Sequence, residues 1–217
     1  MSNSAKYVIT FDLETGGLCK QPRYNEYYPY NQIKYYAGSR VVQIGYTVHK
    51  VTGKKQEFIS EAEYIIAPRG FKIDNERFHG ITHDMAMRQG IEFKDAIALM
   101  QDDFKKASLL VAHNAGFDIN VLLSEMWRQG MTTLATEFAA IPYFCTSLKM
   151  KHTMKLPLPF RRKKKDYKQP NLGELYMWCF GKPIPDEDGK RHTALFDAQR
   201  TAECFLDLLK KNKFVLA

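Results

Sequence analysis

The sequence predicts an α/β fold, with a mixed five-stranded sheet flanked by helices. Three strand-like segments come first along the chain, and the later strand-like segments are separated by helical ones. Neighbouring strands joined by a hairpin pair antiparallel, whereas strands separated by a helix favour parallel pairing. Neither an internal repeat nor a linker divides the 217 residues. We therefore expect a single domain over 1–217, with its core at about 6–210.

The individual elements follow from the hydrophobic pattern and the turn residues. Strands are expected at 7–13, 41–49, 57–66, 108–113 and within 141–148. Val51-Thr52-Gly53-Lys54 joins the second and third strands as a hairpin. Thr82 is expected to cap a short helix that Gly90 ends, and further helices are expected at 93–106, 118–128, 171–180 and about 193–211.

Two segments are too long to be simple connections, and such loops are often functional. Residues 19–40 carry six tyrosines among basic residues, namely Tyr24, Tyr27, Tyr28, Tyr30, Tyr35 and Tyr36. Interleaved aromatic and basic residues are typical of single-strand binding, so this insertion is either a lid or nucleic-acid surface, or a self-packed tyrosine cluster. The second insertion, 155–170, contains the basic run 161–165, which is either a phosphate contact or a solvated loop.

Composition narrows the class of protein. The formal net charge is +8 and the pI is near 9.2, which suits a polyanionic partner. The N-terminus lacks the apolar core of a signal peptide, and no run approaches the length of a membrane span, so no membrane role is expected. The four cysteines are widely separated. We expect an intracellular, cytoplasmic protein and leave a nuclear location open.

Acidic residues in apolar runs suggest a metal site. Asp12 and Glu14 project to the same side of the first strand, about 6.6 Å apart at ~3.3 Å per residue. Like charges at this separation repel unless a cation lies between them. Asp197 lies at the border of the apolar face of the last helix. The alternative to a metal ligand here is an acid at a helix start that the helix dipole favours. For Asp118 the alternative to a metal ligand is the N-cap of a helix. For His192 the alternative to a catalytic role is a surface histidine.

Five ordered motifs resemble those of the DEDDh 3′–5′ exonucleases of the ribonuclease H-like superfamily, which include proofreading subunits of DNA polymerase III and RNase T. The motifs are Phe11-Asp12-Leu13-Glu14-Thr15-Gly16-Gly17-Leu18, Phe78-His79-Gly80-Ile81-Thr82, Ala112-His113-Asn114-Ala115-Gly116-Phe117-Asp118, Asn171-Leu172-Gly173-Glu174-Leu175, and His192 with Asp197-Ala198. The resemblance implies a ribonuclease H-like sheet in which three antiparallel strands precede two parallel ones.

The resemblance also implies a catalytic centre with two Mg²⁺ or Mn²⁺ ions. Asp12, Glu14 and Asp197 would ligate one ion, and Asp12 would bridge to a second held by Asp118. His192 would act as general base on the attacking water. Six residues would lie near the terminal nucleotides: Leu13, Thr15, His79, Ile81, Asn114 and Phe117. For Phe117 and Ile81 the alternative is core packing. Arg161, Arg162 and Lys163 are expected to contact phosphates.

The function predicted from these motifs is divalent-metal-dependent hydrolysis of DNA from single-stranded or frayed 3′ ends, releasing nucleoside 5′-monophosphates in proofreading or repair. The partner is nucleic acid, with DNA favoured over RNA, and a DNA polymerase or another replication or repair protein is a candidate partner. Two alternatives stay open: an exoribonuclease that trims RNA ends, and a non-catalytic module that binds nucleic-acid ends.

Overall fold

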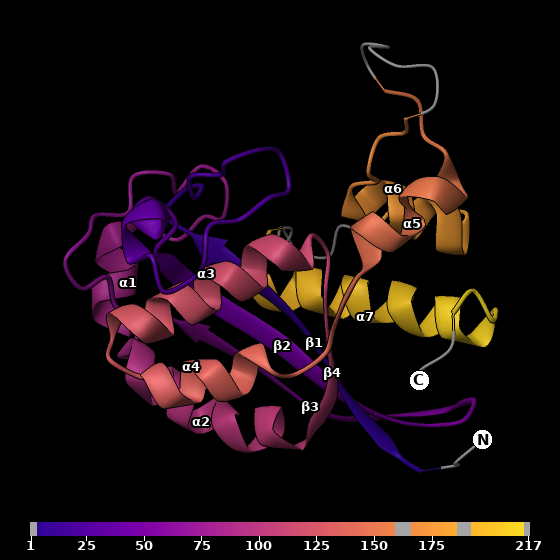
Figure 1. Ribbon diagram of the computed structural model, residues 1–217, viewed down its shortest axis with the longest axis horizontal. Helices are drawn as coiled ribbons and strands as arrows, with labels where there is room; N and C mark the ends of the chain where they lie inside the picture. Colours follow the sequence, from indigo (N-terminus) through magenta and orange to yellow (C-terminus); the bar gives the residue numbers. More distant parts are fainter. Residues whose placement is uncertain (1–3, 159–165, 186–191, 215–217) are drawn as a thin grey trace.

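In the computed structural model, which describes residues 4–158, 166–185 and 192–214, a five-stranded mixed sheet forms the centre of the molecule (Figure 1). The strands are β1 (Lys6–Thr15), β2 (Val41–Thr52), β3 (Lys55–Ile65), β4 (Ala107–Ala112) and β5 (Tyr143–Cys145). Their order in the sheet is β3-β2-β1-β4-β5. The β1–β2 and β2–β3 pairs are antiparallel, and the β1–β4 and β4–β5 pairs are parallel. The predicted fold class is confirmed.

Helices cover both faces of this sheet (Figure 1). They are α1 (His83–Gln89), α2 (Phe93–Lys106), α3 (Ala115–Arg128), α4 (Thr132–Ala139), α5 (Thr146–Met154), α6 (Leu172–Phe180) and α7 (Ala194–Lys210). Helix α7 packs on β1 and β2, and α6 packs on α7 beside α5. Among the described residues, none of the helices combines the length and apolar character that a membrane crossing requires. The single-domain organisation stays a prediction.

The alternation of side chains along β1 separates the core from the acids. Ile9, Phe11 and Leu13 belong to the main hydrophobic cluster, which they form together with residues of α2, α3 and α4. Val8, on the other face of the strand, belongs to a cluster with Phe205 of α7. Because successive residues of a strand point to opposite faces, Asp12 and Glu14 project toward the α7 side. Ile9, Phe11 and Leu13 therefore enter the core on the face of β1 opposite the acids.

Two predicted elements differ in the structure, and two helices are additional. Helix α3 begins at Ala115 with Asn114 as its N-cap, so Asp118 lies inside the first turn and is not the N-cap. The fifth strand, expected within 141–148, is only β5, and α5 begins directly after it because the Cys145 sulfur accepts a hydrogen bond from the Leu148 amide and caps the helix. Helices α4 and α5 were not expected from the sequence.

The tyrosine-rich insertion is mostly packed against the protein. Tyr36 is buried, and the rings of Tyr28 and Tyr35 stack with centroids 3.6 Å apart. Tyr30 meets Trp127 of α3 edge to face. These four tyrosines match the self-packed alternative. Tyr24 instead is 81% exposed, so the other alternative, a lid or nucleic-acid surface, stays open for this part of the insertion.

Candidate active site

Three carboxylates converge where β1 meets the start of α7. Asp12, Glu14 and Asp197 each offer an oxygen, and these oxygens all lie within 4.8 Å of one another. All three residues are partly buried. Hard divalent cations such as Mg²⁺ prefer oxygen ligands and commonly use one or two carboxylates with substrate phosphate. The sequence prediction that these acids share a site therefore agrees with their positions.

Strands β2 and β3 fix the start of α7, and hence Asp197. Gly45 pairs with Asp12 across the β1–β2 ladder. A Cβ atom at Gly45 would lie 2.1 Å from the backbone nitrogen of Leu195, so only glycine allows the helix to approach this closely. The side-chain oxygens of Gln43 and Glu63 accept hydrogen bonds from the amides of Ala194 and Leu195, at 2.9 and 3.0 Å. These bonds satisfy amides that an isolated helix start leaves without partners.

Asp118 is brought to the same centre by α3. The parallel pairing of β1 with β4 ends at Thr10, and β1 continues beyond it beside the start of α3. The Asp118 carboxyl group accepts a hydrogen bond from the backbone amide of Leu13 there, and its side chain is almost fully buried. This contact favours the ionised form of Asp118 and partly offsets the effect of burial on its pKa. Asp118 is therefore held against β1 rather than presented to solvent.

The electrostatics of this cluster favour a bound cation. Burial raises the pKa of Asp12 well above its usual range, and the neighbouring charges of Asp118, Asp197 and Glu14 raise it further. Burial, followed by Asp197, Asp118 and Glu63, raises the pKa of Glu14 to about 8. Burial is also the main cause that raises the pKa of Asp118 to about 8. Ionised acids in this setting repel, and a divalent cation removes both the repulsion and the cost of burial.

His192 lies at the same end of α7 as Asp197. It precedes the N-cap Thr193, whose hydroxyl accepts a hydrogen bond from the Phe196 amide. His192 is exposed and has a left-handed backbone conformation, with φ of 66°. Residues 186–191, which lead to it, lie outside the described residues. Its role as general base stays a prediction.

The residues expected near the terminal nucleotides occupy different environments. Leu13 lies in the main hydrophobic cluster, and Ile81 is buried with Val42 and Ile73. The environment of Ile81 matches the core-packing alternative. His79 is 6% exposed and accepts a hydrogen bond at Nδ1 from the Ile81 amide.

A short chain of hydrogen bonds links His79 to the end of β1. Because Nδ1 of His79 is an acceptor, its Nε2–H donates to the Asn75 side-chain oxygen, at 3.3 Å. The Asn75 Nδ2 in turn donates to the Thr15 carbonyl oxygen, at 2.8 Å. Thr15 and His79 therefore hold the glycine-containing turn after β1 in place. Contact between these two residues and a nucleotide stays a prediction.

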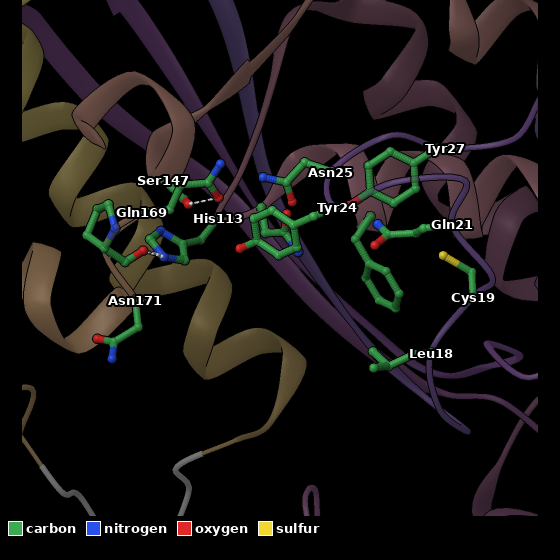
Figure 2. Close-up of a pocket in the computed structure, with 13 residues that line it drawn as sticks. Leu18, Cys19, Gln21, Tyr24, Asn25, Tyr27, His113, Ser147, Gln169 and Asn171 are labelled. Atoms are coloured by element: carbon green, nitrogen blue, oxygen red, sulfur yellow. Dashed lines mark hydrogen bonds between the residues drawn. The ribbon is translucent and has the colours of Figure 1, made fainter. Parts of the chain in front are cut away.

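Asn114 and Phe117 line a cavity of about 380 Å³, and Phe117 directly precedes Asp118 in α3. Figure 2 shows insertion residues such as Tyr24 and Tyr27 together with Gln169, from the segment that connects α5 and α6. Sequence reasoning did not identify Gln169, nor the positioning residues Gln43, Gly45 and Glu63, because their roles depend on strand register and long-range packing. Arg161, Arg162 and Lys163 lie outside the described residues, so their phosphate contact stays a prediction.

Comparisons with known proteins agree with this architecture. A family model described as Exonuclease (RNase T) matches residues 9–205. No curated protein sequence matches the chain. The structure titled exonuclease X in complex with 5′ overhanging duplex DNA has a TM-score of 0.55 and 19% identity, covering 96% of this chain and 93% of that chain.

Two further solved structures are similar to the chain. The nuclease domain of 3′hExo, a DEDDh family member bound to rAMP, has a TM-score of 0.60 and 14% identity, covering 98% and 96% of the two chains. The zinc-bound complex of E. coli exonuclease I with single-stranded DNA has a TM-score of 0.62 and 14% identity, covering 98% of this chain and 42% of that one. At these identities the structures show a shared fold. Since the family model spans most of the sequence, the chain belongs to the exonuclease family.

Proposed function

We propose that this chain is a divalent-metal-dependent 3′–5′ exonuclease that acts on unpaired DNA ends. The observation that carries the proposal is the convergence of Asp12, Glu14 and Asp197, whose oxygens lie within 4.8 Å of one another. A binding module has no need of three mutually repelling carboxylates. Membership of the exonuclease family gives the reaction class, namely hydrolysis of phosphodiester bonds from a chain end.

The residues have distinct tasks in this proposal. Asp12, Glu14 and Asp197 would hold one Mg²⁺ or Mn²⁺ ion, and Asp12 and Asp118 would hold a second. When bound, the ions supply charge stabilisation for in-line displacement at phosphorus. His192 accepts a proton from the attacking water.

The attack forms a new bond between phosphorus and the water oxygen. The bond between phosphorus and the 3′ oxygen of the penultimate nucleotide breaks, and that oxygen takes up a proton. The terminal nucleotide leaves as a nucleoside 5′-monophosphate.

The choice of a nucleic acid as substrate rests on charge, and the preference for DNA rests on similar structures. The net charge of +8 suits a polyanion. Exonuclease X and E. coli exonuclease I, both similar in fold, are described in complexes with DNA. The 3′-exonuclease described with a histone mRNA stem-loop is also similar, which keeps RNA as the alternative substrate.

Polarity and substrate are tested by digesting matched 5′-labelled single-stranded DNA, duplex DNA and single-stranded RNA, first with Mg²⁺ and then with Mn²⁺. We expect shortening from the 3′ end, fastest on single-stranded DNA, and loss of activity in Asp12→Ala. Asp102→Ala, which removes an exposed acid of α2, is the matched control and should retain activity. Activity that survives Asp12→Ala, or products that shorten from the 5′ end, would refute the proposal.

A further inference from the structure

We infer that the cavity between the tyrosine-rich insertion and the α5–α6 connection binds one unpaired nucleobase of the strand that enters the active site. This cavity, here called the side cavity, is lined by Tyr24, Asn25 and Tyr27 on the insertion and by Asn114, Phe117 and Gln169 elsewhere. Its volume of about 380 Å³ falls within the ~300–1,000 Å³ typical of small-molecule sites. The inference rests on the proposed function and names a determinant of its substrate choice.

The insertion forms a fixed wall of the side cavity. Tyr36 is buried and its hydroxyl donates to the carbonyl oxygen of Tyr28, while the Lys20 amide donates to the Tyr35 carbonyl oxygen at 2.8 Å. From α3, Arg128 donates to the carbonyl oxygen of Ile33 at 3.1 Å. These contacts anchor the insertion on both sides of the residues that face the side cavity.

The opposite wall is fixed through His113. Its Nε2–H donates to the Pro170 carbonyl oxygen at 3.0 Å, which leaves Nδ1 to accept from the Thr146 hydroxyl at 2.9 Å. Burial lowers the pKa of His113 to about 4, so the ring is neutral at physiological pH. His113 thereby ties the end of β4 to the segment before α6. Figure 2 shows His113, Ser147 and Gln169 together at one side of the cavity, with Tyr27 at the other.

Carboxamide side chains distinguish this site from a plain apolar crevice. A smaller cavity of about 120 Å³ adjoins the first, and both are lined by Asn25, Tyr27, Asn114 and Gln169. Three of these four carry a carboxamide, which offers a donor next to an acceptor and matches the edge of a base. Ser147 donates to the Gln169 side-chain oxygen at 3.2 Å, which orients that amide with its nitrogen available as a donor.

An aromatic platform and a close approach to the acids complete the case for a base. Tyr24 is 81% exposed, and an exposed ring supports stacking of an unpaired base. Tyr27 packs on Gly116 so closely that a Cβ there would lie 2.8 Å from the ring. Gly116 lies two residues before Asp118 in α3, so the ring of Tyr27 packs beside the helix turn that carries this acid. A strand whose end lies at the acids therefore passes the side cavity.

The test compares two substrates in Tyr24→Ala, Asn25→Ala and Gln169→Ala. Bis(p-nitrophenyl) phosphate with Mn²⁺ carries no nucleobase and reports on the acids alone, whereas single-stranded oligonucleotides report on the whole path. In Tyr24→Ala we expect kcat/KM for the oligonucleotide to fall about 5- to 160-fold more than kcat/KM for the small ester, the range given by base stacking. Asn25→Ala and Gln169→Ala, which remove hydrogen-bonding groups, should change this ratio in the same direction by a smaller factor. Phe58→Ala, which removes an exposed ring of β3, is the matched control and should not change this ratio.

Binding separates this inference from the proposed function. Fluorescence anisotropy with Ca²⁺ measures oligonucleotide affinity without requiring hydrolysis, using strands in which one abasic nucleotide is moved stepwise from the 3′ end. We expect one position at which base removal weakens binding to the wild type and has no effect on Tyr24→Ala. Equal affinity at every abasic position would overturn the inference even if the chain hydrolyses DNA. Failure to hydrolyse either substrate would refute the proposed function alone.

Discussion

Substitution of Gly45 by alanine should separate α7 from the sheet and disable the metal site. Gly45 lies opposite Asp12, and the start of α7 crosses it directly. The added Cβ would lie 2.1 Å from the Leu195 nitrogen, whereas ordinary contact begins at 3.4 Å. The atoms that this Cβ would meet belong to the backbone of Ala194 and Leu195 and cannot turn aside as a side chain can. The helix start must therefore move outward by about 1.3 Å, the difference between these two distances. Asp197, two residues further along, moves with it.

The energetic and catalytic costs follow from this displacement. Overpacking costs about 1–3 kcal/mol, and the two hydrogen bonds from Ala194 and Leu195 to the sheet, worth ~1 kcal/mol each, lengthen as the helix moves. We expect the free energy of unfolding to fall by about 2–4 kcal/mol. A misplacement of ~1 Å at a catalytic group can cost about 10²-fold in rate. We expect a kcat loss of this size together with weaker Mn²⁺ binding.

The assay measures kcat with a labelled oligonucleotide, Mn²⁺ affinity by calorimetry and stability by urea unfolding. Gly173→Ala is the matched control, because a Cβ at this position in α6 would make only an ordinary contact of 3.5 Å. It should keep full activity and gain up to about 1 kcal/mol from helix propensity. Wild-type metal affinity and kcat in Gly45→Ala would refute the reasoning that the β2–α7 approach positions Asp197.

Three further predictions follow from the site and the core. Replacement of His192 by alanine should lower kcat by ~10²–10⁴-fold while Mn²⁺ affinity, measured by calorimetry, stays near wild type; unchanged kcat would exclude its role as base. In EDTA, the melting temperature should fall from pH 5 to pH 8, because the folded chain, with the pKa values of Glu14 and Asp118 near 8, binds more protons there than the unfolded chain. Each group contributes at most ~1.4 kcal/mol per pH unit, and a rising melting temperature would contradict this sign. Arg40→Met should cost about 3–5 kcal/mol in urea unfolding, because it removes the two hydrogen bonds, of 2.7 and 2.9 Å, that Arg40 donates to the buried carboxylate of Glu125, which keeps only its longer contacts with Arg128 and Gln129; a loss below 1 kcal/mol would contradict it.

The hydrophobic pattern and the turn residues were sufficient to predict the sheet and the face of β1 from which its acids project. Strand alternation is a property of the chain itself, so Ile9, Phe11 and Leu13 could be assigned to the core and Asp12 to the other face. The start of α3 could not be predicted in this way. Gly116 and Asn114 indicate a turn, but the glycine is inside the helix, where the Tyr27 ring packs on its backbone.

The positioning of Asp197 depends on information that the sequence pattern does not contain. Gly45 has its role only because the β1–β2 register places it opposite Asp12 and because α7 crosses there. Gln43 and Glu63 bind the helix start from two different strands, at sequence separations above one hundred residues. Hydrophobic periodicity gives the elements, whereas these contacts arise from the way the elements pack.

The central claim, that the clustered acids hold a divalent cation, is tested most directly by calorimetric titration of the EDTA-treated chain with Mn²⁺ at pH 7. Titrations in two buffers with different ionisation enthalpies report the protons released. Because Glu14 and Asp118 have pKa values of about 8, we expect Mn²⁺ to bind with proton release and Asp197→Asn to weaken that binding. Absence of Mn²⁺ binding, or binding without proton release and unaffected by Asp197→Asn, would contradict the account.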